Sequence, residues 1–186
     1  MPRLSNRRVV PPAYTDFLMN RTYRAVVILA ALSLSGRVDA RTRVVTGSRE
    51  VHVTMQARGS FEVKLNPQGP DETVQGVSVG RSSIEKLFDG DLKGTSKGEM
   101  LTGMGNEKGS GVYVAIERVT GTLHGHSGTF VLAHRGTMTR GAQELVITIV
   151  PDSGTHELVG IAGSMTITIT GREHFYVLEY TLPESR

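Results

Sequence analysis

The feature that most restricts the fold of this sequence is an alternation of apolar and polar residues with a period of two, which begins at Val51. A period of two places successive side chains on opposite faces of a β-strand. No segment has the pattern of an amphipathic helix. The segments with this pattern, from which eight or nine strands are expected, are Val51–Met55, Phe61–Leu65, Ile84–Phe88, Leu92–Leu101, Gly111–Leu123, Gly128–Met138, Leu145–Val150, Thr155–Ile161, Met165–Thr170 and His174–Leu182.

Glycine punctuates this pattern throughout. Twenty of the 22 glycines lie in residues 55–186, where they make up roughly 15% of the segment against a usual ~7%. Glycine inside strands marks the bends and close backbone approaches that barrel closure demands. The strands also follow one another as hairpins with short turns. The sequence therefore predicts an all-β protein, a closed antiparallel barrel of eight or nine strands, with a non-globular N-terminal extension.

The N-terminal extension contains an eleven-residue run of apolar and small residues, Ala25–Ser35. Arg21 and Arg24 precede this run, and Val38-Asp39-Ala40 after it has the small–x–small pattern of a cleavage site. That order is typical of a secretory signal peptide, and the run is too short to cross a bilayer as a helix. We therefore expect a leader over residues 1–40, a secreted or periplasmic protein, and no stable membrane span.

Other readings of the extension stay open. Met19 stands immediately before the basic stretch and is an alternative translation start. An unstructured extension on a cytoplasmic protein explains the same segment. Residues 41–54 are expected to be a linker with the approach to the first strand, and residues 55–186 to be the barrel domain.

The positive charge of the chain belongs to this extension. Residues 1–54 carry nine arginines and three acidic residues, whereas residues 55–186 carry twelve basic and fifteen acidic residues. Binding to nucleic acid needs clustered cations, and the barrel has no dense stripe of them. A nucleic-acid partner is therefore not expected. The chain also has no cysteine, which excludes disulfides, thiol nucleophiles and thiolate metal sites.

Two hairpins can be given a register from their turns. In the first, Gly125-His126 is predicted as a two-residue loop, because glycine first suits a type II′ turn. Glu117 then faces His134 on one side of the hairpin. The other residues expected on that inward side are Tyr113, Val119, Leu123, Phe130, Leu132 and Met138.

In the last hairpin, the loop Gly171-Arg172 pairs Ile167 with Tyr176, Met165 with Leu178 and Gly163 with Tyr180. Its inner face is expected to hold Met165, Ile167, Ile169, His174, Tyr176, Leu178 and Tyr180. Both registers depend on the turn, since a shift of one residue inverts every face.

A carboxylate and an imidazole on an apolar barrel wall are costly unless they pair. Glu117 and His134 are therefore candidate catalytic residues, as a general-base pair. The alternative is a structural hydrogen-bonded pair. Further candidate ligand-binding residues are Ser96, on a strand face of small residues, and the aromatic residues Tyr113, Phe130, Tyr176 and Tyr180.

No metal site or cofactor is expected. His124-Gly-His126 has the spacing of paired metal-binding histidines, but Phe130 and Val131 occupy the positions where a carboxylate ligand is needed. Gly103-Met-Gly105 is too short for a dinucleotide-binding loop.

Four segments carry a resemblance to a known family: Phe88–Met100, Gly111–Met138, Val150–Gly154 and Gly160–Gly163. They resemble an uncharacterised bacterial domain family that is grouped with the allene oxide cyclase-like barrels, over about residues 55–184. The resemblance implies a small eight-stranded calycin-like barrel and supplies no catalytic residues. Allene oxide cyclase itself is a cofactor-free isomerase, but a shared fold is a weak warrant for a shared activity.

Three function classes follow. The first is a barrel that binds a small hydrophobic molecule without catalysis. The second is a cofactor-independent isomerase or cyclase that uses Glu117 and His134. The third is a structural or assembly protein, and a homo-oligomer is compatible with all three. An eight-stranded barrel is just wide enough for its own side chains or one small ligand, so the sequence leaves these classes open.

Overall fold

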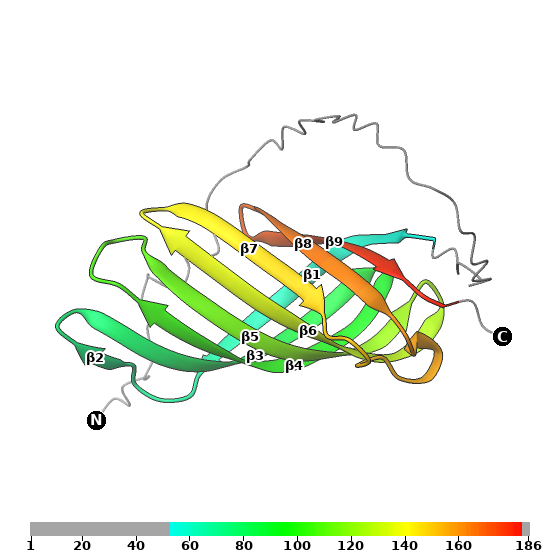
Figure 1. The fold of residues 1–186 in the computed structure, drawn as a ribbon, viewed down its shortest axis with the longest axis horizontal. Helices are drawn as coiled ribbons and strands as arrows, with labels where there is room; N and C mark the ends of the chain where they lie inside the picture. The colour runs from blue at the N-terminus through cyan, green and yellow to red at the C-terminus, as the bar shows by residue number, and fades with distance from the viewer. Residues whose placement is uncertain (1–52, 184–186) are drawn as a thin grey trace, which may run out of the picture.

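The computed structural model describes residues 53–183, which form one nine-stranded antiparallel sheet rolled into a barrel (Figure 1). The leader expected over residues 1–40 lies outside the described residues. The elements in chain order are β1 (Met55–Pro67), β2 (Glu72–Val74), β3 (Val77–Gly90), β4 (Leu92–Met104), β5 (Gly111–Leu123), β6 (His126–Thr139), β7 (Ala142–Ile149), the 3₁₀ helix η1 (His156–Leu158), β8 (Ala162–Thr170) and β9 (Glu173–Thr181).

The barrel closes through β1. Its first half pairs with β9 and its second half pairs with β3, while β3 to β9 pair in sequence order. Eight strands thus complete the barrel, and β2 is an extra strand paired only with β3. The predicted all-β fold and closed eight-stranded antiparallel barrel are confirmed.

The strand predicted at Thr155–Ile161 is wrong. This stretch holds η1 and its flanking turns, with His156 at a positive φ of 54°. Its apolar residues do not alternate across a sheet; Leu158 and Ile161 both pack into the core at one end of the barrel. Within residues 53–183, no helix is long and apolar enough to span a membrane.

The two ends of the barrel differ. The β5–β6 turn and η1 lie at the same end of the barrel (Figure 1). The interior there is filled by fully buried side chains, among them Leu92, Leu123, Phe130 and Leu158. We call this the closed end. At the opposite end, the inward-facing Leu65, Ile167 and Ile169 are only partly buried, and Leu145 is 39% exposed. We call this the mouth.

The register predicted for the last hairpin is confirmed: Ile167 lies opposite Tyr176, and Met165 opposite Leu178. The register predicted for the first hairpin is wrong by two residues. Its loop is His124-Gly125, with φ values of 46° and 88°, which suit a type I′ turn. Because a shift of two residues preserves the faces of both strands, the inward-facing set of this hairpin is unchanged.

Candidate functional site

A charged side chain lies at the centre of the barrel. Glu117 points inward from β5 and is fully buried. Its neighbours in the sheet are Gly98 on β4 and Leu132 on β6. A side chain at Gly98 would collide with the backbone of Glu117, so glycine is required for the close approach of β4 and β5.

Three side chains from three other strands converge on this carboxylate. Lys86 Nζ on β3 donates a hydrogen bond to Oε1 at 2.6 Å, and His134 Nε2 on β6 lies 2.9 Å from the same oxygen. Ser96 Oγ on β4 donates to Oε2 at 2.9 Å. We call Lys86, Ser96, Glu117 and His134 the polar cluster. All four residues are less than a tenth exposed.

The cluster keeps its carboxylate ionised. Burial alone would raise the pKa of Glu117, but the hydrogen bond from His134 and the charge of Lys86 outweigh it and lower the pKa to about 2. An ionised carboxylate only accepts hydrogen bonds, so His134 Nε2 must carry the proton that it shares with Oε1. The pairing of Glu117 with His134 therefore fixes the ring orientation of the imidazole.

Lys86 is the member of the cluster with unused donors. Its ammonium group has three N–H bonds, of which one is directed at Glu117. Nζ also lies 4.9 Å from the ring centre of Phe61 and 5.9 Å from that of Phe88. Burial and then the charge of Lys86 lower the pKa of His174, so this nearby imidazole favours its neutral form. The cation is thus held among aromatic groups and one carboxylate.

Tyr113 lies on the same face of β5 as Glu117, on the mouth side of the cluster. Burial, and then the negative charge of Glu117, raise the pKa of the Tyr113 hydroxyl, which keeps it protonated. Its ring lies over Gly136, the residue opposite it on β6. A side chain at Gly136 would overlap that ring, so this glycine makes room for the tyrosine.

One buried polar atom near the mouth has no hydrogen-bond partner within residues 53–183. Ser82 is 1% exposed and points inward from β3, on the same face as Lys86. Its hydroxyl is the buried side-chain group that none of the described residues satisfies with a hydrogen bond. A buried hydroxyl without a partner costs free energy, which a bound acceptor or donor would recover.

The other predicted site residues lie at the closed end, away from the cluster. Phe130 is fully buried in the packed core there. The hydroxyl of Tyr176 accepts a hydrogen bond from the Leu92 amide at 2.9 Å, and that of Tyr180 is 2.8 Å from His124 Nδ1. These hydroxyls tie β9 to two turns and are already engaged. The structure thus brings Ser96, Glu117 and His134 together with Tyr113 close by, and keeps the other three apart.

Lys86 was missed by sequence reasoning. In Ile84-Glu-Lys-Leu-Phe88, each face of the strand carries apolar residues and one charged residue, so the alternation does not show which face is inward. The signal that could have found Lys86 is the need of Glu117 for a counter-charge, because a buried carboxylate is costly without a cation. If the apolar Phe88 points inward, Lys86 points inward too, because the two residues are two apart on one strand.

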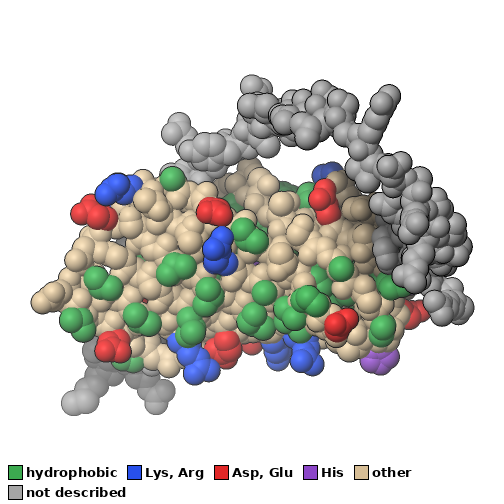
Figure 2. Space-filling model, in the orientation of Figure 1, with side chains coloured by type: hydrophobic (Ala, Val, Ile, Leu, Met, Phe, Trp, Pro, Cys, Tyr) green, Lys and Arg blue, Asp and Glu red, His purple; other side chains and the backbone are tan. Residues whose placement is uncertain are grey.

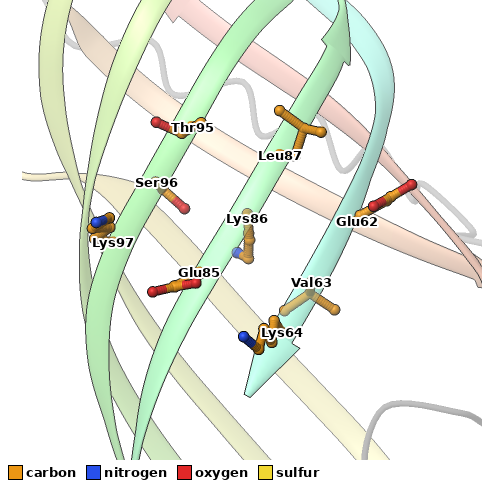
Figure 3. A pocket seen from close by; sticks show the side chains of 9 residues that line it. All are labelled: Glu62, Val63, Lys64, Glu85, Lys86, Leu87, Thr95, Ser96 and Lys97. Atoms are coloured by element: carbon orange, nitrogen blue, oxygen red, sulfur yellow. The ribbon is translucent and has the colours of Figure 1, made fainter. Parts of the chain in front are cut away.

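A hollow of about 320 Å³ lies on the outer wall of β1, β3 and β4 (Figure 3). The register puts exposed side chains in two rows on either side of it: Glu62, Leu87 and Thr95 in one, and Lys64, Glu85 and Lys97 in the other. Lys86 lies between the rows and turns its side chain inward. The hollow is therefore separate from the interior polar cluster.

The comparisons with known proteins agree on one relationship. The sequence pattern of DUF3224, described as a protein of unknown function, matches residues 57–180. A crystal structure of a protein with unknown function from this family, from Shewanella oneidensis, is similar with a TM-score of 0.67 and 43% sequence identity. The match covers 72% of this chain and 100% of that one. No curated protein matches the chain.

Proposed function

We propose that this chain, which belongs to the DUF3224 family, binds a small, mainly apolar molecule inside its barrel. The observation that carries the proposal is the polar cluster itself. Burying the charges of Lys86 and Glu117 costs several kcal/mol per ion, which a purely apolar interior would avoid. Groups kept at such a cost are frequently functional.

The cluster is suited to hold the polar end of such a molecule. The two N–H bonds of Lys86 that Glu117 does not occupy can be donated to a ligand oxygen. Ser82 offers an unsatisfied hydroxyl on the same strand. Both point inward from β3, with Ile84 between them and Met100 opposite Ser82.

The mouth is suited to hold the apolar part. The inward side chains of Leu65, Leu145, Ile167 and Ile169 keep part of their surface exposed there. An apolar ligand would cover these side chains further. Its binding would gain a free energy of ~25 cal/mol per Å² of apolar surface removed from water. The closed end offers no such surface, because its core residues are fully buried. We therefore place the ligand between the mouth and the cluster.

Mass spectrometry of what the purified protein retains tests this proposal. The full chain is purified without denaturant from its native host and then extracted with organic solvent. A bound compound in near-stoichiometric amount is expected from the wild type, and a large loss of it from Lys86→Met. Lys64→Met is the matched control, because Lys64 is an exposed lysine on the outer face of β1. An extract without any compound, or equal retention by Lys86→Met, would refute the proposal.

A second candidate is a cofactor-independent isomerase or cyclase. The hydrogen bond between His134 Nε2 and Glu117 favours it, because it orients the ring and directs Nδ1 away from the carboxylate as a proton acceptor. With its pKa held at about 2, Glu117 is a weak base, so it would position His134. The resemblance to allene oxide cyclase-like barrels supports this candidate as an analogy between folds. Conversion of the retained compound to an isomer, abolished in His134→Gln, would distinguish it from simple binding.

A further inference from the structure

Two ionised side chains point into the barrel, and their charges cancel. Inward and outward positions alternate along the described strands, and the acidic and basic residues at the inward positions are Glu117 and Lys86. They form an ion pair at 2.6 Å, with side chains that are 0% and 6% exposed. The buried pair therefore has no net charge to offer a ligand.

The titratable groups around this pair favour their neutral forms. Burial, and then the charge of Glu117, raise the pKa of the Tyr113 hydroxyl. Burial, and then the charge of Lys86, lower the pKa of His174. One carboxylate balances one cation, so an imidazolium at His134 would leave an excess positive charge buried beside Lys86, which favours the neutral imidazole. The interior as a whole is thus close to electrically neutral.

A charged ligand would upset this neutrality. A carboxylate bound to the unused N–H bonds of Lys86 would share one ammonium group with the carboxylate of Glu117. Two carboxylates at one site raise the pKa of one of them, so that a proton must be taken up. A ligand cation would lie beside Lys86 without a free counter-charge. An uncharged oxygen acceptor, such as a carbonyl group, can use the same N–H bonds at neither cost.

The rim of the mouth has no excess of positive charge either. The connections between strands at this end carry three acidic and three basic residues, all of them exposed: Asp71, Glu72, Glu107, Lys108, Arg140 and Arg172. Figure 2 shows acidic and basic side chains together at this end of the molecule, on the left. Such a rim lacks the one-sign field that would draw anions to the barrel.

A second point along β3 also suits an uncharged group. Ser82 points inward four residues nearer the mouth than Lys86, about 13 Å along the strand, with Ile84 between them. Its partners across the sheet are the apolar residues Pro67 and Met100. Its buried hydroxyl has no hydrogen-bond partner among the described residues. A charge there would be unpaired, whereas a neutral chain could pass along this wall and satisfy the hydroxyl with a polar atom.

We infer that the molecule bound by the barrel is an uncharged carbonyl compound, a ketone, aldehyde or ester, rather than a carboxylate. Its oxygen accepts a hydrogen bond from Lys86, and its apolar chain extends past Ile84 toward the mouth. The inference rests on the proposed function, since it names the class of molecule that the polar cluster accepts. Glu117 determines this specificity, because its charge already neutralises the cation that a carboxylate would need.

Isothermal titration calorimetry of the ligand-stripped full chain with two isosteric probes tests the inference. Undecan-2-one and decanoic acid share the chain and the carbonyl group, and a methyl group in the ketone replaces the acidic hydroxyl group, which is ionised at neutral pH. We expect the ketone to bind at least about tenfold more tightly, because decanoate must take up a proton in order to bind. Decanoate that binds as tightly as the ketone would overturn this inference and leave the proposed function standing. Binding of neither probe would refute both.

Proton uptake gives a second readout on the wild type. Titrations in two buffers of different ionisation enthalpy should show about one proton taken up per decanoate bound, and none per ketone. Decanoate that binds without proton uptake would overturn the inference.

A charge-neutralising variant tests the role of Glu117. Glu117→Gln leaves Lys86 without its counter-charge, so decanoate should bind at least about tenfold more tightly than to the wild type, and without proton uptake. Glu85→Gln is the matched control, because Glu85 is exposed on the outer face of the same strand as Lys86. An unchanged preference for the ketone in folded Glu117→Gln would contradict the role of Glu117. If this variant does not fold, the proton uptake of the wild type still decides the inference.

Discussion

His134 and Glu117 are hydrogen-bonded across β5 and β6, although neither lies directly opposite the other. The ladder places Glu117 opposite Leu132 and His134 opposite Ala115, and the two polar side chains meet along the diagonal at 2.9 Å. Diagonal neighbours on one face of a sheet are within reach of long side chains. The small side chain of Ala115 leaves the imidazole free to lean toward the carboxylate. This diagonal contact brings β6 into a network that also spans β3 and β4.

The first prediction concerns the stability that this network provides. Glu117→Gln should lower the free energy of unfolding by about 3–5 kcal/mol, because it leaves the ammonium group of Lys86 buried without its counter-charge. The double variant Lys86→Met/Glu117→Gln removes both charges and should lose clearly less than the sum of the single changes. Urea unfolding of the three variants measures this. Strictly additive losses would show that the two residues are not coupled.

The second prediction concerns pH. The pKa of Glu117 in the folded protein, about 2, lies below its ordinary value of 4.5. Between these values the unfolded chain binds more protons, so the contribution of Glu117 is complete above pH 4.5 and is lost as the pH falls toward 2. The contribution of Glu117 to the free energy of unfolding is on the order of 3 kcal/mol. The stability difference between wild type and Glu117→Gln should therefore shrink over this window. A difference that stays constant down to pH 2 would contradict the assignment.

The third prediction concerns Gly136. An alanine there would overlap the ring of Tyr113, whereas an alanine at Gly103 on the outer face of β4 would only touch Val112 at 3.5 Å. Gly136→Ala should therefore destabilise the barrel by about 1–3 kcal/mol, and Gly103→Ala by much less. In a Tyr113→Leu background the cost of Gly136→Ala should fall. Thermal unfolding compares the variants, and equal effects at both glycines would refute the account of this contact.

The fourth prediction concerns the N-terminus. The run Ala25–Ser35 with its flanking arginines and Val38-Asp39-Ala40 is expected to direct secretion and then to be removed. Protein isolated from the native host should begin near Arg41 and should be found outside the cytoplasm. Intact mass measurement checks this. A cytosolic protein that retains residues 1–40 would sink the proposal of a leader.

The sequence was sufficient for the fold and for the faces of the hairpins, because alternation and turn residues are local signals. At the last hairpin, Gly171 at a φ of 63° identifies the turn, and the register follows. At the β5–β6 turn, His124 occupies the first loop position with a positive φ of 46°, whereas the predicted type II′ turn placed a glycine there. Histidine is among the residues that adopt this conformation more readily than most, and the ring of His124 is hydrogen-bonded to Tyr180, 56 residues away in the chain.

The candidate site was only partly predictable, for a related reason. Glu117 and His134 lie on adjacent strands joined by a tight turn, so their proximity could be worked out from the hairpin alone. Lys86 reaches the same carboxylate from β3, two strands away and 31 residues earlier in the chain. Its approach depends on the closure and curvature of the whole barrel, which no local pattern contains.

The central claim is that the polar cluster holds the polar end of a ligand inside the barrel. The side-chain ¹⁵N spectrum of Lys86 and His134 tests it most directly, recorded while the compound released from the purified protein is titrated into ligand-stripped protein. The account predicts saturable shifts of the Lys86 Nζ and His134 ring signals, with the His124 signals at the closed end unchanged. Lys86 and His134 signals that stay in place while the compound binds, or a protein that binds no compound at all, would contradict it.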